Sequence, residues 1–194
     1  MFERKHKPQA IEGNSMDIDM TLNVRPNADF QLVIDPTVGD IIKGRGEGTL
    51  NLHINPRSNV FEMYGDYTIT EGSYLFTLQN IINKRFIIEN GSTIQWTGEP
   101  LDARLNINAV YKLKTSLQPL IGTSVSSGGG DMNLNRAVPV ECIINLSDRL
   151  THPTVTFDVK VPTADAEYQT IIANTLNTQS AIAEQFMFLL VTNS

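Results

Sequence analysis

The chain has 194 residues and a formal net charge of -6, with 41% hydrophobic and 19% charged residues. This balance is typical of a chain that folds around a core, and the acidic charge argues against nucleic-acid binding, which needs a basic surface. The single cysteine excludes an intramolecular disulfide, and no stretch approaches the roughly 20 apolar residues of a membrane-spanning helix.

The first predicted element is a strand at residues 16–24. Every even position from Met16 to Val24 is apolar, and every odd position is polar. Because successive side chains of a strand point to opposite faces, this alternation predicts one apolar face and one polar face. The same pattern returns at residues 30–34, 50–54, 105–109, 138–146 and 155–161.

Turn-forming residues separate the strand candidates about every ten residues, which indicates an all-β fold. We expect strands to end at residues 25–27, 35–36, 43–46, 55–59, 71–73, 89–92 and 98–100. This spacing leaves a sandwich, a barrel and a solenoid open, although the lack of a strict sequence repeat disfavours a regular β-helix.

Candidate catalytic side chains are few. Asp17 and Asp19 share one strand face, as the paired carboxylates of a glycosidase do, but Thr21 and Asn23 continue that face. We therefore expect a solvated sheet surface there. Neither a Gly-x-Ser-x-Gly nor a His-Glu-x-x-His motif occurs. The sequence predicts no catalytic residue and a protein that is not an enzyme.

Metal and cofactor sites are not predicted either. His6, His53 and His152 lie far apart in the sequence and have no cysteine pairs beside them, which is not metal-ligand spacing. His53 falls on the polar side of its strand, so we expect it to face solvent. Cys142 falls on the apolar side of its strand, which predicts a buried, unreactive thiol.

The last part of the chain changes character. The Gly- and Ser-rich stretch at about 122–136 predicts a flexible loop inside a β-rich domain at 1–162. From 163 to 194 the apolar spacing becomes helical, with Thr163 as the expected N-cap and a C-terminus that we expect to be truncated. This segment either caps the sheet or plugs an apolar groove. Its stripes are Tyr168, Ile171, Ile172 and Leu176, then Ile182, Phe186, Leu189 and Leu190.

Two motifs in the middle of the chain carry a family resemblance. Residues 65–74 read Gly-x-Tyr-x-x-x-x-Gly-x-Tyr, and residues 91–100 read Gly-Ser-Thr-Ile-Gln-Trp-Thr-Gly-Glu-Pro. Together they resemble the C-terminal domain of the TamB family (translocation and assembly module, DUF490), in its Bacteroidetes form. The resemblance spans about residues 60–190, whereas residues 1–59 match only in pattern. Gly72 and Gly91 suit turns with positive φ, and Trp96 is expected to pack inward.

The resemblance implies a fold and a setting. TamB proteins are long proteins of the Gram-negative envelope, with an inner-membrane anchor and a β-rich periplasmic body. Their fold is the β-taco, a sheet curled into a groove with an apolar interior, and their partner is an Omp85-type outer-membrane protein such as TamA. Their roles are carrying phospholipids between the membranes and assisting the assembly of outer-membrane proteins. We therefore expect a periplasmic fragment of an anchored protein.

Two functional hypotheses follow from this resemblance. In the first, the apolar groove holds phospholipid acyl chains; in the second, the groove or a sheet edge receives β-strands of barrel precursors or of the Omp85-type partner. A sealed β-sandwich that binds nothing is the third possibility. The predicted groove lining is Ile18, Met20, Leu22, Phe30, Leu32, Leu50, Leu52, Ile54, Phe76, Leu78, Trp96, Leu105, Ile107, Val140, Ile144, Phe157 and Val159.

Overall fold

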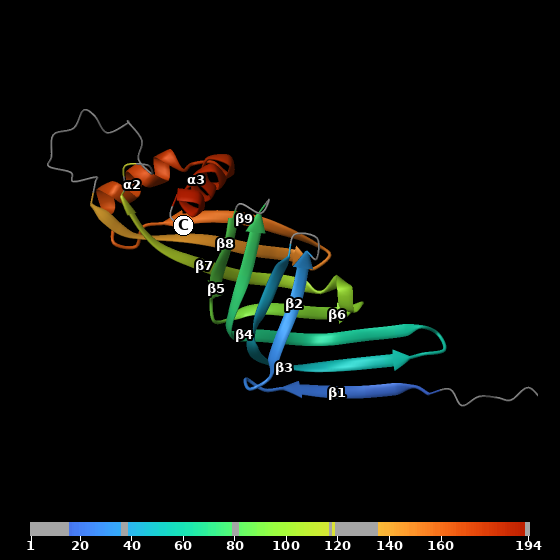
Figure 1. Ribbon diagram of the computed structural model, residues 1–194. Helices are drawn as coiled ribbons and strands as arrows, with labels where there is room; N and C mark the ends of the chain where they lie inside the picture. The colour runs from blue at the N-terminus through green and yellow to red at the C-terminus, as the bar shows by residue number, and fades with distance from the viewer. Residues whose placement is uncertain (1–15, 36–38, 79–81, 117, 119–135, 193–194) are drawn as a thin grey trace, which may run out of the picture.

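The computed structural model describes residues 16–35, 39–78, 82–116, 118 and 136–192, and it confirms the predicted all-β fold with a helical C-terminal segment (Figure 1). Its strands form one antiparallel sheet. The strands are β1 (Ile18–Val24), β2 (Asp29–Asp35), β3 (Asp40–Asn55), β4 (Val60–Leu78), β5 (Ile82–Ile88), β6 (Ser92–Gly98), β7 (Arg104–Ser116), β8 (Ala137–Arg149) and β9 (His152–Lys160). A 3-10 turn, η1 (Pro100–Asp102), precedes β7, and the helices are α2 (Ala166–Thr175) and α3 (Gln179–Thr192). His6 and almost all of the predicted loop at 122–136 lie outside the described residues.

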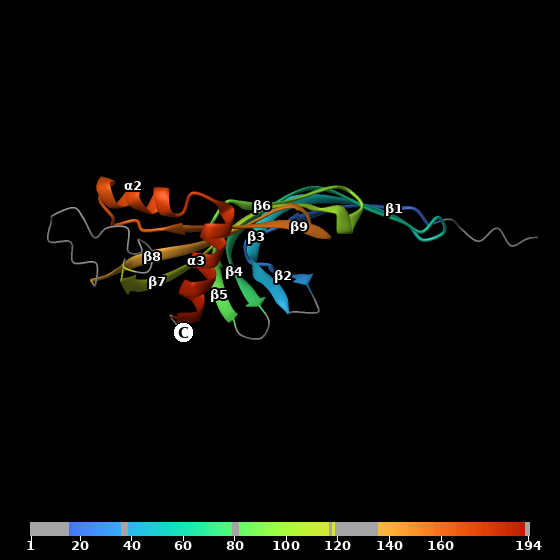
Figure 2. The same ribbon diagram turned by 90° about the horizontal axis from the view of Figure 1, so that it is seen from above.

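Two long strands give the sheet its curled shape. The first half of β3 pairs with β2 and its second half with β1, while β4 pairs with β6 and then with β5. The long strands thus take part in two branches of the sheet, one with β1 and β6 and the other with β2 and β5. β7 pairs with both β5 and β6, which joins the branches, and the sheet continues into β8 and β9. The two branches cross in Figure 1, and Figure 2 shows β2 and β5 turned away from the layer of β1, β6 and β9. The result is a bent sheet with a concave apolar side.

The bend lies at glycines in two stretches for which the sequence predicts turns. Residues 43–46 and 71–73 were expected to end strands, but β3 and β4 run through them. Gly44 lies opposite Gly72, and a Cβ on Gly44 would come within 2.9 Å of the Gly72 Cα atom. Both glycines therefore permit close approach of two bending strands. Gly91 does occupy a turn, with a φ of 90°, as predicted.

The structure shows the alternation predicted for β1, with polar contacts on one face of the strand and apolar contacts on the other. On the outer face the Thr21 hydroxyl donates to Asn51 over 2.9 Å, and the Thr49 hydroxyl donates to Asn23 over 3.0 Å. On the concave face Met20 and Leu22 lie opposite Leu52 and Leu50 of β3. Both faces of β1 remain largely exposed, because β1 is the last strand of its branch among the described residues.

The helical segment differs from its prediction in one detail. Asp165, not Thr163, caps α2, because its carboxylate accepts a hydrogen bond from the Tyr168 backbone N–H over 3.1 Å. The amide of Gln169 also donates to the Val161 carbonyl over 2.9 Å, which ties the helix to the end of β9. No helix in the described part of the chain is long and apolar enough to cross a membrane.

Candidate functional site

The concave face is closed at the end that carries α3. The Phe186 side chain of α3 is fully buried, and its ring centroid lies 4.5 Å from that of Phe157 and 5.9 Å from that of Phe86. Phe76 completes this aromatic cluster at 6.4 Å. In Figure 2 α3 runs from the level of β9 toward β5. The predicted helical stripe thus fills the concave side here, and we call this part the closed end.

The other end of the concave face is not covered by any described residue. Met20 on β1 is 47% exposed, Leu22 is 46% exposed, and Phe61 on β4 is 46% exposed. Leu52 on β3 lies between Met20 on β1 and Met63 on β4 and is paired with both, so the apolar surface is continuous from β1 to β4. We call this part the open end. Apolar side chains this exposed on neighbouring strands are typical of a binding surface.

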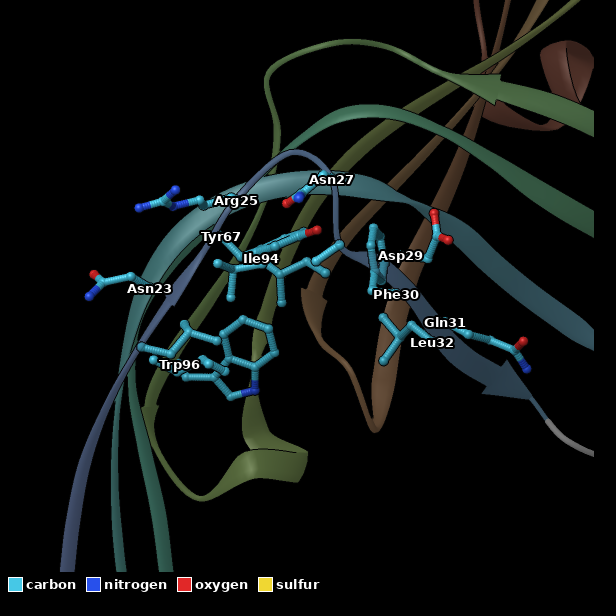
Figure 3. Close-up of a pocket in the computed structure, with 14 residues that line it drawn as sticks. Asn23, Arg25, Asn27, Asp29, Phe30, Gln31, Leu32, Tyr67, Ile94 and Trp96 are labelled. Atoms are coloured by element: carbon cyan, nitrogen blue, oxygen red, sulfur yellow. The ribbon is translucent and has the colours of Figure 1, made fainter.

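A cavity of about 540 Å³ lies where the open end meets the bend, and we call it the corner pocket (Figure 3). This volume falls within the range of about 300–1,000 Å³ that is usual for small-molecule sites. Its apolar lining is Leu22, Val24, Ala28, Phe30, Leu32, Leu50, Tyr67, Ile94 and Trp96, and its polar lining is Asn23, Arg25, Asn27, Asp29 and Gln31.

The glycine-rich bend also makes the walls of the corner pocket. A Cβ on Gly46 would lie 2.8 Å from the Tyr67 ring, so the bare backbone lets that ring lie over the bend. Phe30 meets the Tyr67 ring edge-to-face, with centroids 5.1 Å apart. Trp96 is fixed by its indole N–H, which donates to the Pro100 carbonyl over 3.1 Å. Three aromatic walls are therefore held in place before any ligand binds.

Among the described residues, the charged groups of the corner pocket lie at its rim. Asp29 is paired with the Arg45 guanidinium at 2.6 Å, and Glu71 lies 3.2 Å from the same group. Figure 3 shows the side chains of Asn23, Arg25 and Gln31 pointing away from the apolar centre of the cavity. The cavity therefore suits an apolar ligand with a polar end directed outward.

One polar atom is out of place in these walls. Tyr67 is only 5% exposed, and its buried hydroxyl has no hydrogen-bond partner among the residues that the structure describes. Burial also raises the pKa of Tyr67 above its ordinary value, so the hydroxyl stays protonated at neutral pH. An unpaired buried hydroxyl costs about 1–3 kcal/mol.

All of the predicted lining residues except Leu78 fall into three groups. Five line the corner pocket: Leu22, Phe30, Leu32, Leu50 and Trp96. Four lie on the open end, namely Ile18, Met20, Leu52 and Ile54, and Leu78 is partly exposed at the end of β4. Seven lie in or against the core: Phe76, Leu105, Ile107, Val140, Ile144, Phe157 and Val159. Their role in ligand binding stays a prediction for all three groups.

Sequence reasoning missed several lining residues. Phe61 and Met63 lie opposite Ile54 and Leu52. The turn predicted at 55–59 would have identified them, because pairing across that hairpin places both on the apolar face. Tyr67 and Ile94 belong to the family motifs and are direct partners in the β4–β6 pairing, and Phe30 of β2 packs against Tyr67.

The other candidate groups are placed away from the corner pocket. Cys142 is buried, and desolvation raises its pKa to about 12, which leaves an unreactive thiol. His53 lies on the outer face, 2.8 Å from Asp19 and 3.7 Å from Asp17. Within the described ranges no group of three His, Cys, Asp or Glu residues is placed to hold a metal ion.

A family model described as the TamB C-terminal domain matches residues 2–193. The chain belongs to the TamB family. The match also includes residues 2–59, where the sequence resembles the family only in pattern. No match was found among curated proteins or among solved structures. The chain is thus a TamB-like protein of the cell envelope, and its bent sheet supplies the concave apolar surface described above.

Proposed function

We propose that the open end of this TamB domain holds phospholipid acyl chains, as part of a periplasmic protein that is anchored in the inner membrane and carries phospholipids between the inner and outer membranes. The observation that supports this proposal most is the exposed apolar surface from β1 to β4, which leads into the corner pocket. The closed end offers no such surface, because Phe186 fills it.

The physical basis is burial without directional contacts. Each methylene group removed from water contributes about 0.8 kcal/mol, so a chain of ten buried methylenes gains on the order of 8 kcal/mol before ordering costs. Dispersion and burial do not depend on an exact register. A chain can therefore shift along the open end without losing all its contacts at once.

The test compares two substitutions on β1 that differ in the face they occupy. Leu22→Arg places a charge beside the corner pocket, whereas Thr21→Arg places the same charge on the outer face. Each protein is purified, analysed by native mass spectrometry and extracted with organic solvent. We expect phospholipid with the parent and with Thr21→Arg, and a loss of most of it with Leu22→Arg.

Folding must be checked in each protein by circular dichroism. A folded parent that carries no lipid, and takes none from vesicles of phosphatidylethanolamine and phosphatidylglycerol, would contradict the proposal. Equal lipid in the two arginine variants would contradict the assignment of the open end.

A second candidate function rests on the outer edge of β1. The sequence of β1 contains no Pro, Gly, Lys or Arg, and its described partners lie on one side only. The edge of β9 is protected by Pro153 and Lys160, and the Val159 N–H is occupied by the Asp158 carboxylate at 2.8 Å. β1 is therefore suited to accept a strand of an outer-membrane protein precursor or of an Omp85-type partner.

Two proline variants separate strand addition from lipid binding. Backbone N–H groups of an edge strand point alternately inward and outward, so one of Met20→Pro and Thr21→Pro removes an outward donor. The folded variant that lacks an outward donor should lose affinity for an extended barrel-strand peptide. Thr21→Pro, which leaves the apolar side chains of β1 unchanged, should keep its lipid. Unchanged peptide affinity in the folded variant that lacks an outward donor would exclude addition at β1.

A further inference from the structure

The two sides of the corner pocket differ in polarity. Its inner side is formed by the paired strands β3, β4 and β6 and carries apolar and aromatic side chains. These are Leu50, Tyr67, Ile94 and Trp96. The polar lining belongs to β1, β2 and the turn between them, and Figure 3 shows the Asn23, Arg25 and Gln31 side chains pointing away from the cavity. A ligand therefore meets hydrocarbon on the inner side and polar groups only at the rim.

The described residues of the inner side leave no hydrogen-bonding group for a ligand. Backbone groups of β3, β4 and β6 point along the sheet to neighbouring strands rather than into the cavity. The indole N–H of Trp96 is bonded to the Pro100 carbonyl. The Tyr67 hydroxyl oxygen has almost no accessible surface, so a ligand cannot reach it. A polar atom of a ligand would lose its water here without gaining a partner.

The cavity also ends at the bend. Phe30 and Tyr67 both line it, and their rings pack edge-to-face with centroids 5.1 Å apart. Farther toward the closed end, Ile42 on β3 and Ile69 on β4 are fully buried in the core. In the opposite direction the lining continues to Leu22, which is 46% exposed at the open end. For the described part of the chain, a ligand thus enters from the open end and stops at the two rings.

A blind apolar cavity accepts the end of a hydrocarbon chain. The ester and head group of a lipid carry oxygen atoms that would lose their water on the inner side, and the middle of a chain would have to fold back there. The terminal methyl group carries no polar atom and needs no onward path.

We infer that the corner pocket binds the methyl end of an acyl chain at Trp96, while the ester and head group stay at the open end. This inference rests on the proposed function and deepens it. It sets the direction in which the bound lipid lies, and it selects chains that end in unsubstituted hydrocarbon.

Two positional isomers test this direction. They are 2-hydroxyhexadecanoic acid and 16-hydroxyhexadecanoic acid, each titrated beside unmodified hexadecanoic acid into the delipidated full chain. The parent should bind the 2-hydroxy acid within about twofold of hexadecanoic acid, because that hydroxyl stays in water with the head. It should bind the 16-hydroxy acid about 5- to 150-fold more weakly, because that hydroxyl would be buried without a partner.

Trp96 reports the position of the chain directly, because it is the only tryptophan of the sequence and lies on the inner side. Bromine quenches tryptophan fluorescence at short range. At equal saturation, 11,12-dibromooctadecanoic acid should quench Trp96 more strongly than its 6,7-dibromo isomer. The control is the double variant Trp96→Phe/Phe61→Trp, which moves the single indole to the exposed position of Phe61 at the open end. There the 6,7-dibromo isomer should quench more strongly.

Circular dichroism checks that the parent and the double variant are folded. Equal affinity of the parent for the two hydroxy acids would overturn the inference and leave the lipid proposal intact. Quenching of Trp96 that is equal for the two bromine positions, or stronger from the 6,7-dibromo isomer, would do the same. If the folded parent binds none of these acids and takes no phospholipid from vesicles, the lipid proposal fails as well.

Discussion

At the scale of single residues, His53 on the outer face carries the clearest pH dependence. The hydrogen bond that the His53 ring donates to the Asp19 carboxylate raises the pKa of His53. Desolvation lowers this pKa, and the negative charges of Asp17, Asp19 and Glu62 raise it further. Because the pKa of His53 is raised in the folded state, protonated His53 stabilises the β1–β3 pair. This contribution is fully present below the pKa that His53 has in the unfolded state. That contribution is lost as the pH rises through the folded-state value.

We therefore predict that Asp19→Asn lowers the pKa of His53 and removes most of this pH dependence. The measurement is an NMR titration of the His53 ring, together with urea unfolding on both sides of its pKa. Asp17→Asn should have the smaller effect, since Asp17 is 3.7 Å from the ring and makes no hydrogen bond to it. Equal effects of the two substitutions would contradict this account.

At the scale of elements, α3 is held by the side chain that closes the concave face. Phe186 is fully buried among aromatic rings, while Phe188 on the same helix is 46% exposed. Phe186→Ala should cost about 3–5 kcal/mol of unfolding free energy, the usual range for a buried phenylalanine. Phe188→Ala should stay within about 0.5 kcal/mol. Urea denaturation of both variants measures the difference, and similar costs would show that α3 is not anchored in this way.

The same elements show what the sequence can and cannot reveal. Alternation in β1 and helical spacing in α3 are local signals, so both elements were predicted at close to their observed positions. The bend in β3 depends on which strand lies opposite Gly44, and that is not a local property. The predicted lining contained five residues of the corner pocket, but not Tyr67, because the cavity forms only when β2 and β6 approach each other at the bend.

At the scale of the whole molecule, the two ends of the sheet should differ in local stability. β7 and β8 each pair with neighbouring strands on both sides and contribute residues to the core. The described partners of β1 lie on one side only. We predict that amides of β7 and β8 exchange slowest, and that those of β1 exchange fastest among the strands. Hydrogen–deuterium exchange by mass spectrometry checks this order. Added phospholipid should slow exchange in β1 and in the turn at residues 25–28, and uniform slowing would contradict binding at the open end.

The aromatic plug formed by Phe186 has a kinetic consequence. With the Phe186 side chain in place, the described residues close the concave face at one end, so a ligand would enter and leave at the open end. If the open end holds acyl chains as proposed, an incoming chain and an outgoing chain would use the same entrance, so the rate of turnover would be set by exchange at the open end. Passage of an acyl chain beyond the closed end would require α3 to move away from the sheet, and the free energy of that movement would be the barrier to transfer.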